Sequence, residues 1–114
     1  MYLVKMSKVI SVSFYENFTK AKPFAYITEY NYCGQKGLLF TGKRADSIYG
    51  YLQREIGLCS SCVRKDNWYP FQFFASIDIN DENRDKILKK LIRFADSTAD
   101  HRDLPYMQAV DNNN

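Results

Sequence analysis

The stretch F-A-Y-I-T-E-Y-N-Y, which occupies residues 24–32, decides how this chain folds. Its aromatic residues Phe24, Tyr26, Tyr30 and Tyr32 fall at alternating positions. Successive side chains of a β-strand point to opposite faces, so this spacing places four rings on one face of a sheet. Tyrosine joins an apolar ring to a hydroxyl that tolerates water. The face is therefore either core or a docking surface.

Two interpretations of this face stay open. The sequence favours rings that fill the core, because the alternate positions make a poor apolar face: Ala25, Ile27, Glu29 and Asn31. The second interpretation leaves Tyr26, Tyr30 and Tyr32 on the open face of the sheet, with Trp68 and Phe74 across from them. Tyr, Trp and Arg are the residues that most often anchor interfaces. The face that the helices cover decides between the two.

Two further strands are predicted beside the aromatic one. Residues 9–15 alternate apolar and polar side chains, which is typical of a half-buried strand. Residues 33–37 contain two glycines and predict a turn, and residues 38–40 then return as a short strand. The segment from 24 to 40 is therefore expected to form a β-hairpin.

From Lys43 to Ile56 the apolar residues recur at helical spacing instead of at alternate positions, which predicts a helix. Gly57 is a natural end for this helix. Gly50 weakens such a helix by about 1 kcal/mol relative to Ala, which leaves room for a tight contact at this position. Residues 58–67 are predicted to form a loop.

The clearest alternation in the chain runs from residue 69 to 79 and predicts a strand, with Pro70 near its start or on a sheet edge. Asn80 and Asp81 then cap a second helix. Its apolar stripe consists of Ile87, Leu88, Leu91, Ile92 and Ala95. Its opposite side carries Lys86, Lys89, Lys90 and Arg93, which we interpret as a solvated face.

The predicted order is β-β-β-α-β-α, which indicates an α+β fold. We expect an antiparallel sheet of about four strands, with two amphipathic helices packed on one face. A length of 114 residues suits one domain, assigned here to residues 1–111, with residues 112–114 as a frayed tail.

Positive charge is concentrated in the first 44 residues, which hold seven Lys or Arg against two Glu, a local charge of +5. The remaining residues hold nine basic and eleven acidic groups, a local charge of −2. An acidic partner, nucleic acid included, would favour the N-terminal half. An ordinary solvated surface explains the same distribution.

No apolar run approaches the ~18 residues that a membrane-spanning helix needs, so we expect no membrane association. The N-terminus lacks the uninterrupted apolar segment of a secretion signal. Three cysteines, an odd number, suit a reducing compartment. We therefore expect a cytoplasmic protein.

Cysteine spacing raises the question of a zinc site. Cys59 and Cys62 have the spacing with which two thiolates reach one metal, and Cys33 with His101 could complete a tetrahedral set. The last two residues sit in unrelated segments, and no second spaced pair is present. Ordinary thiols are therefore favoured, and neither a metal nor a cofactor is expected.

Two other candidate sites are weak. Residues 37–43 match G-x-x-x-x-G-K, but Arg44 stands where a phosphate-binding loop requires Ser or Thr. Lys43 and Arg44 nevertheless oppose the dipole of their own helix, which hints that they serve a partner. His101 is the only histidine and lies in a polar, acidic segment, so no catalytic residue is assigned and we expect no enzyme.

The sequence thus favours a small non-catalytic binding protein of the inhibitor or adaptor type. Phages and mobile elements are a plausible source of such proteins. A protein partner is preferred, and oligomeric state is left open. The alternative is nucleic-acid binding by tyrosine stacking and phosphate contacts. The candidate partner-binding residues are Tyr26, Tyr30, Tyr32, Lys36, Lys43, Arg44, Arg64, Lys65 and Trp68.

Overall fold

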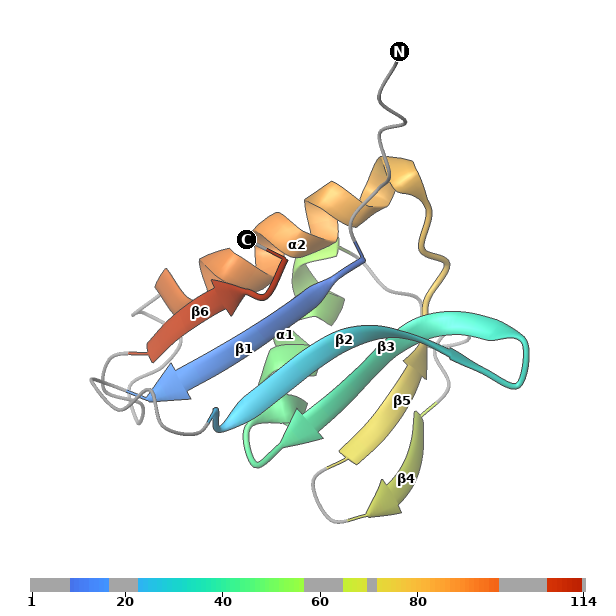
Figure 1. Ribbon diagram of the computed structural model, residues 1–114, viewed down its shortest axis with the longest axis horizontal. Coiled ribbons are helices and arrows are strands. Elements are labelled where there is room, and N and C mark those ends of the chain that lie inside the picture. The colour runs from blue at the N-terminus through green and yellow to red at the C-terminus, as the bar shows by residue number, and fades with distance from the viewer. Residues whose placement is uncertain (1–8, 17–22, 57–64, 70–71, 97–106, 114) are drawn as a thin grey trace.

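Six antiparallel strands form one sheet in the described part of the chain, and two helices pack on one of its faces (Figure 1). The computed structural model describes residues 9–16, 23–56, 65–69, 72–96 and 107–113. The strands are β1 (Ser11–Glu16), β2 (Ala25–Tyr32), β3 (Gln35–Gly42), β4 (Lys65–Tyr69), β5 (Gln72–Ser76) and β6 (Met107–Asp111). The helices are α1 (Ala45–Ile56) and α2 (Asp81–Asp96), and the strand order across the sheet is β4-β5-β3-β2-β1-β6.

The predicted α+β class and the order of the expected elements are confirmed. Two further strands extend the sheet at its edges. β6 pairs with β1, and β4 occupies part of the expected loop and the beginning of the expected strand 69–79. That strand is divided because Tyr69 and Gln72 pair antiparallel across a hairpin. Pro70 lacks a backbone N–H, so the sequence is poorly suited to an unbroken ladder at this point.

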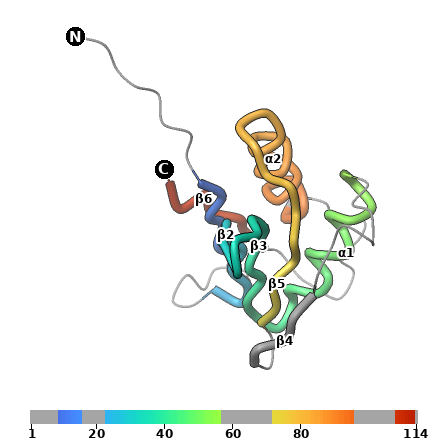
Figure 2. Tube along the Cα trace, turned by 90° about the vertical axis from the view of Figure 1, so that its right-hand side faces the viewer, coloured from blue at the N-terminus to red at the C-terminus, as the bar shows by residue number. Residues whose placement is uncertain are grey.

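The helices cover the face on which apolar side chains align across the strands. Val12, Ile27, Phe40 and Phe73 lie opposite one another in β1, β2, β3 and β5, and all four are buried. Figure 2 shows both helices on the same side of the sheet. The core is completed from the helices by Ile48, Leu52, Ile87, Leu91 and Phe94. The opposite face of the sheet carries no helix in the described part of the chain.

The β2–β3 hairpin is closed by the two residues Cys33 and Gly34, because Tyr32 pairs with Gln35. Both loop residues have positive φ, 53° and 80°, which is the backbone of a type I′ turn. This turn matches the right-handed twist of the strands. β2 and β3 remain paired over eight residues each, so the third strand is longer than the expected 38–40.

The predicted cap of α2 is confirmed. Asn80 Oδ1 accepts hydrogen bonds from the N–H groups of Glu82 and Asn83, each at 2.9 Å. Asn83 Oδ1 accepts the N–H of Asn80 in return at 2.8 Å. This reciprocal pattern satisfies N–H groups that the helix itself leaves unpaired.

Two residues of the tail expected to fray form hydrogen bonds, Asn112 with β1 and Asn113 with Val9 just before β1. Asn112 donates its N–H to Ser11 O at 2.8 Å and its side-chain amide to Ser13 Oγ at 3.0 Å. Asn113 donates its side-chain amide to Val9 O at 2.5 Å.

Of the described helices, neither is long and apolar enough to cross a membrane.

Candidate binding surface

The tyrosines of β2 lie on the helix-free face of the sheet. Ala25 and Ile27 of β2 point toward the helices and are buried. Because side chains alternate along a strand, Tyr26, Tyr30 and Tyr32 point the other way. The interpretation that these rings fill the core is therefore wrong. Ala25 and Ile27 contribute to the core as small and branched side chains, and the aromatic rings of the core come from other strands of the sheet, at Phe14, Phe40 and Phe73.

Phe24 departs from the predicted stripe. It precedes β2 and its ring lies 6.4 Å from that of Phe14, a core residue. Phe24 therefore packs against the core, and the stripe consists of three tyrosines.

Phe74 of β5 joins two of these tyrosines into an aromatic cluster on the helix-free face. Its ring centroid lies 6.2 Å from that of Tyr30 and 5.4 Å from that of Tyr32. Phe74 is fully buried, whereas Tyr30 is 42% exposed. Gly37 lies between them in β3, and a Cβ there would approach Phe74 Cζ to 2.7 Å. The missing side chain makes room for the ring, which forms the base on which the tyrosines rest.

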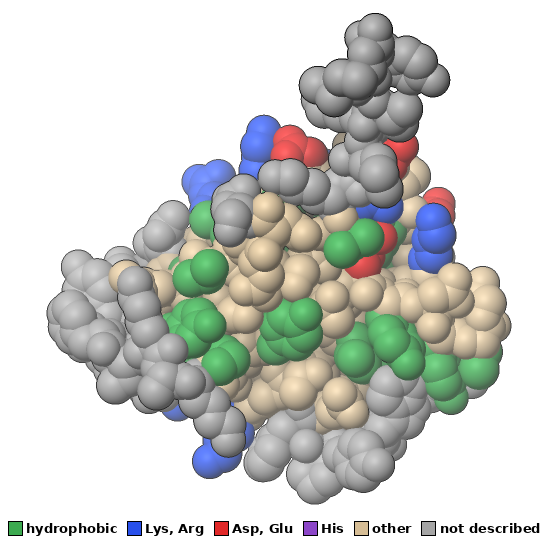
Figure 3. All heavy atoms as spheres, viewed as in Figure 1, with side chains coloured by type: hydrophobic (Ala, Val, Ile, Leu, Met, Phe, Trp, Pro, Cys, Tyr) green, Lys and Arg blue, Asp and Glu red, His purple; other side chains and the backbone are tan. Residues whose placement is uncertain are grey.

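The rest of the helix-free face is uncharged and carries polar side chains together with apolar Leu39 and Val110. Tyr26 shares a hydrogen bond with Ser11, with 3.0 Å between their hydroxyl oxygens, and Gln72 Nε2 donates to Thr41 Oγ1 at 3.3 Å. No charged residue occupies an outward-facing position of β1, β2, β3, β5 or β6. Figure 3 views this face and shows hydrophobic side chains in its middle, with Lys and Arg at the margins.

Three of the basic candidates, Lys36, Lys43 and Arg44, do not join the tyrosines. Lys36 alternates with buried Leu38, so it falls on the helix side of the hairpin, where its charge acts on Glu29. Lys43 and Arg44 lie between β3 and α1, at the other end of β3 from the hairpin turn (Figure 1). Arg44 O accepts the N–H groups of Ser47 and Ile48, so Arg44 stands at the start of the helix as expected.

The remaining candidates are only partly covered by the structure. Arg64 lies outside the described residues, as do Cys59, Cys62 and His101. Lys65 and Trp68 belong to β4, and the backbone of Lys65 is paired with that of Ala75. Cys33 is an exposed free thiol in the hairpin turn. Among the described residues, no three His, Cys, Asp or Glu side chains are grouped to hold a metal.

A partly buried ion pair behind the tyrosines was not foreseen. Glu29 lies on the helix side of β2, and Arg84 of α2 meets it with Nε to Oε1 at 2.7 Å and Nη2 to Oε2 at 3.1 Å. The two side chains are only 11% and 13% exposed. Ile10 N–H also donates to Glu29 Oε1 at 2.8 Å. The sequence signal that could have revealed this pair is Glu29 itself, because a carboxylate at an inward-facing strand position requires a cation opposite it.

Electrostatics around this pair favour the charged forms. Burial acts to raise the pKa of Glu29, but hydrogen bonds from Arg84 and Ile10 outweigh it and the pKa is lowered. The hydrogen bond to Glu29 is the main cause that raises the pKa of Arg84. The pair fixes α2 to the strand that carries the tyrosines.

Comparison with known protein families, with curated proteins and with solved structures found no match. The function is therefore argued from geometry alone. The helix-free face offers aromatic rings and hydroxyl groups, a chemistry suited to contact with another macromolecule.

Proposed function

We propose that this chain is a non-catalytic binding protein of the inhibitor or adaptor type, which holds a protein partner against the helix-free face of its sheet. The observation that carries the proposal is that the helices bury Ala25 and Ile27, leaving Tyr26, Tyr30 and Tyr32 on the other side. Binding surfaces rich in Tyr and Ser combine large rigid rings with adaptable hydroxyls. A cytoplasmic location belongs to the same proposal, supported by the odd number of cysteines.

The charge distribution supports a protein partner over nucleic acid. Phosphate recognition requires Lys or Arg beside the stacking rings. The outward-facing positions of the described strands around the tyrosines carry no such residue, and Lys43 and Arg44 lie at the far end of β3. An uncharged face with aromatic anchors is suited to a protein surface that buries little charge.

Affinity capture from a lysate, with and without nuclease, followed by titration of the recovered partner, tests the proposal. Tyr30→Ala should weaken binding at least about tenfold. An anchoring aromatic side chain commonly contributes about 2 kcal/mol or more to binding, and about 1.4 kcal/mol already corresponds to a factor of ten. Lys89→Ala is the matched control, because Lys89 is exposed on α2, on the helix side of the sheet. Equal binding by the wild type and Tyr30→Ala would refute the proposal.

Nucleic-acid binding stays the second candidate, supported by the charge of +5 in residues 1–44 and by exposed Lys36 beside the hairpin turn. Binding dominated by phosphate contacts weakens steeply as salt rises. A protein interface anchored by aromatic rings should change little over the same salt range. Capture that is abolished by nuclease and by salt would favour this candidate.

A further inference from the structure

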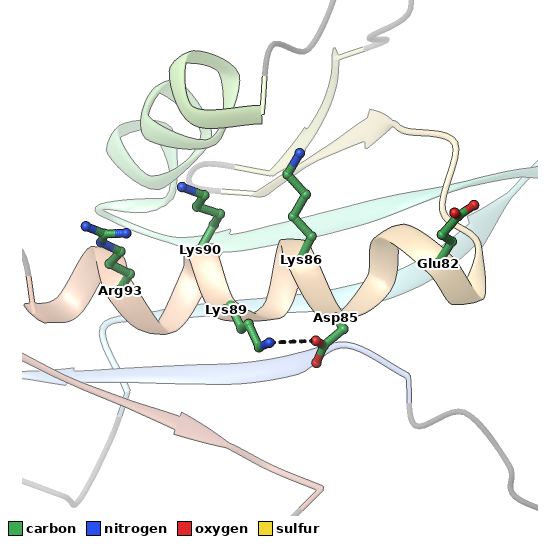
Figure 4. Close-up of a pocket in the computed structure, with 6 residues that line it drawn as sticks. All are labelled: Glu82, Asp85, Lys86, Lys89, Lys90 and Arg93. Carbon is green, nitrogen blue, oxygen red and sulfur yellow. Dashed lines mark ion pairs between the residues drawn. The ribbon is translucent and has the colours of Figure 1, made fainter.

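A second surface lies on α2, on the other side of the molecule from the tyrosines, and this surface is charged. A shallow groove of about 360 Å³ is lined by six residues of this helix: Glu82, Asp85, Lys86, Lys89, Lys90 and Arg93. Figure 4 shows Lys86, Lys90 and Arg93 projecting on the side of α2 that is nearer to α1. The four cations predicted to form one solvated face thus divide into these three and Lys89, which projects on the opposite side.

Internal ion pairs leave two of the four cations for a partner. Lys89 pairs with Asp85 at 3.0 Å on the other side of the helix, and both are strongly exposed. Lys90 pairs with Glu55 of α1 at 3.2 Å and is only 24% exposed, so it is held across the groove. No described carboxylate forms an ion pair with Lys86 or Arg93. These two residues are seven positions apart, about 10 Å along the helix.

We propose that this groove binds a short acidic peptide segment of a partner protein. Glutamates at alternate positions of an extended peptide lie on one face about 7 Å apart, within reach of the long Lys86 and Arg93 side chains, with Lys90 between them. Glu82 and Asp85 make the other end of the groove acidic. A continuous phosphate backbone would be repelled there, whereas a peptide can carry its carboxylates at one end only.

This site is independent of the tyrosine face and goes beyond the function proposed above. The two surfaces lie on opposite sides of the sheet (Figure 2). A protein that binds one partner on each side would join them, which is the action of an adaptor.

Titration of the full chain with the peptide Glu-Gly-Glu-Gly-Glu-Gly-Ser-Gly-Ser, which carries its carboxylates at one end, followed by amide chemical shifts, tests the proposal. The wild type should bind at low salt with shifts centred on α2, and Lys86→Gln/Arg93→Gln should weaken binding about tenfold. Lys43→Gln/Arg54→Gln removes the same net charge elsewhere and should leave affinity unchanged. Both pairs of residues include exposed positions, and circular dichroism checks that each variant is folded.

Three results would overturn the proposal. In the first two, the wild type fails to bind the glutamate peptide, or both double variants lose affinity equally, which indicates unspecific charge attraction. In the third, short oligothymidylate binds more tightly than the peptide and Lys86→Gln/Arg93→Gln abolishes its binding, which assigns the groove to nucleic acid.

Discussion

Arg84 of α2 holds the carboxylate of Glu29 in β2 with two hydrogen bonds, at 2.7 Å and 3.1 Å. The residues are 55 positions apart in sequence, and Arg84 also bonds Asp81 within its own helix. The next residue after Glu29 is Tyr30, which points to the opposite face of the sheet. The ion pair therefore fixes, from the helix side, the strand that presents the proposed binding surface.

Arg84→Ala should destabilise the protein by about 2 kcal/mol, because it leaves the partly buried Glu29 carboxylate without its cation. Urea denaturation measures the loss. Lys89→Ala is the control: Lys89 and Asp85 are 76% and 68% exposed, and loss of such a pair should change stability by less than about 1 kcal/mol. Similar effects from both substitutions would show that burial does not strengthen the Arg84 pair.

The pKa of Glu29 also makes stability depend on pH. Its pKa is lowered from 4.5 in the folded protein, so the stabilisation is fully present above about pH 4.5 and is lost as pH falls through the folded-state pKa. Glu29→Gln should be less stable at neutral pH and should lose less stability on acidification. Urea midpoints measured from neutral pH down to about pH 3 check this. Parallel pH profiles for the two proteins would contradict it.

The fold class was predictable because each main element has its own period in the sequence. Alternation at 9–15 and 24–32, and the spacing of Ile48 and Leu52, depend on local geometry alone. β6 escaped prediction because its pairing with β1 joins Val110 to Ser13, residues far apart in sequence. The split of strand 69–79 was missed because the apolar alternation runs from Tyr69 past Pro70 to Phe71 and Phe73 without a break.

The orientation of the tyrosines could not be settled from the sequence. The set that faces the core made a poor apolar face in isolation, because it contains Glu29 and Asn31. Only the distant Arg84 makes an inward-facing Glu29 tolerable. Phe74 was foreseen opposite the tyrosines, because the alternation of its strand put it out of phase with Phe73.

Gly37→Ala should destabilise the protein by about 2 kcal/mol, in the range of overpacked cores. Its Cβ would collide with the backbone carbonyl oxygen of Ala75 and approach Phe74 Cζ to 2.7 Å. Backbone in the middle of a paired strand cannot move aside cheaply. Thermal unfolding measures the effect, and altered tyrosine fluorescence should report displacement of the aromatic cluster. An unchanged midpoint would mean that β3 and β5 separate more easily than their pairing indicates.

Gly50→Ala should have the opposite sign. The structure offers no tight contact at this position, since a Cβ would meet only Arg54 Nη1 at 3.6 Å, an ordinary van der Waals distance. Alanine in a helix interior is favoured over glycine by about 1 kcal/mol, so the variant should be stabilised by about that amount. Thermal unfolding measures the gain, and a lower midpoint would reveal a contact that restricts this face of α1.

Phe74→Ala and Tyr30→Ala should separate stability from binding. Phe74 is fully buried, so its truncation should cost about 3 kcal/mol in urea denaturation. Tyr30 rests on Phe74 but is 42% exposed, so its truncation should cost much less while removing a large part of partner binding. The reverse order of stabilities would show that Tyr30 is the structural member of the cluster. Tyr30→Phe, which keeps the ring, should preserve both properties if the ring rather than the hydroxyl makes the contact.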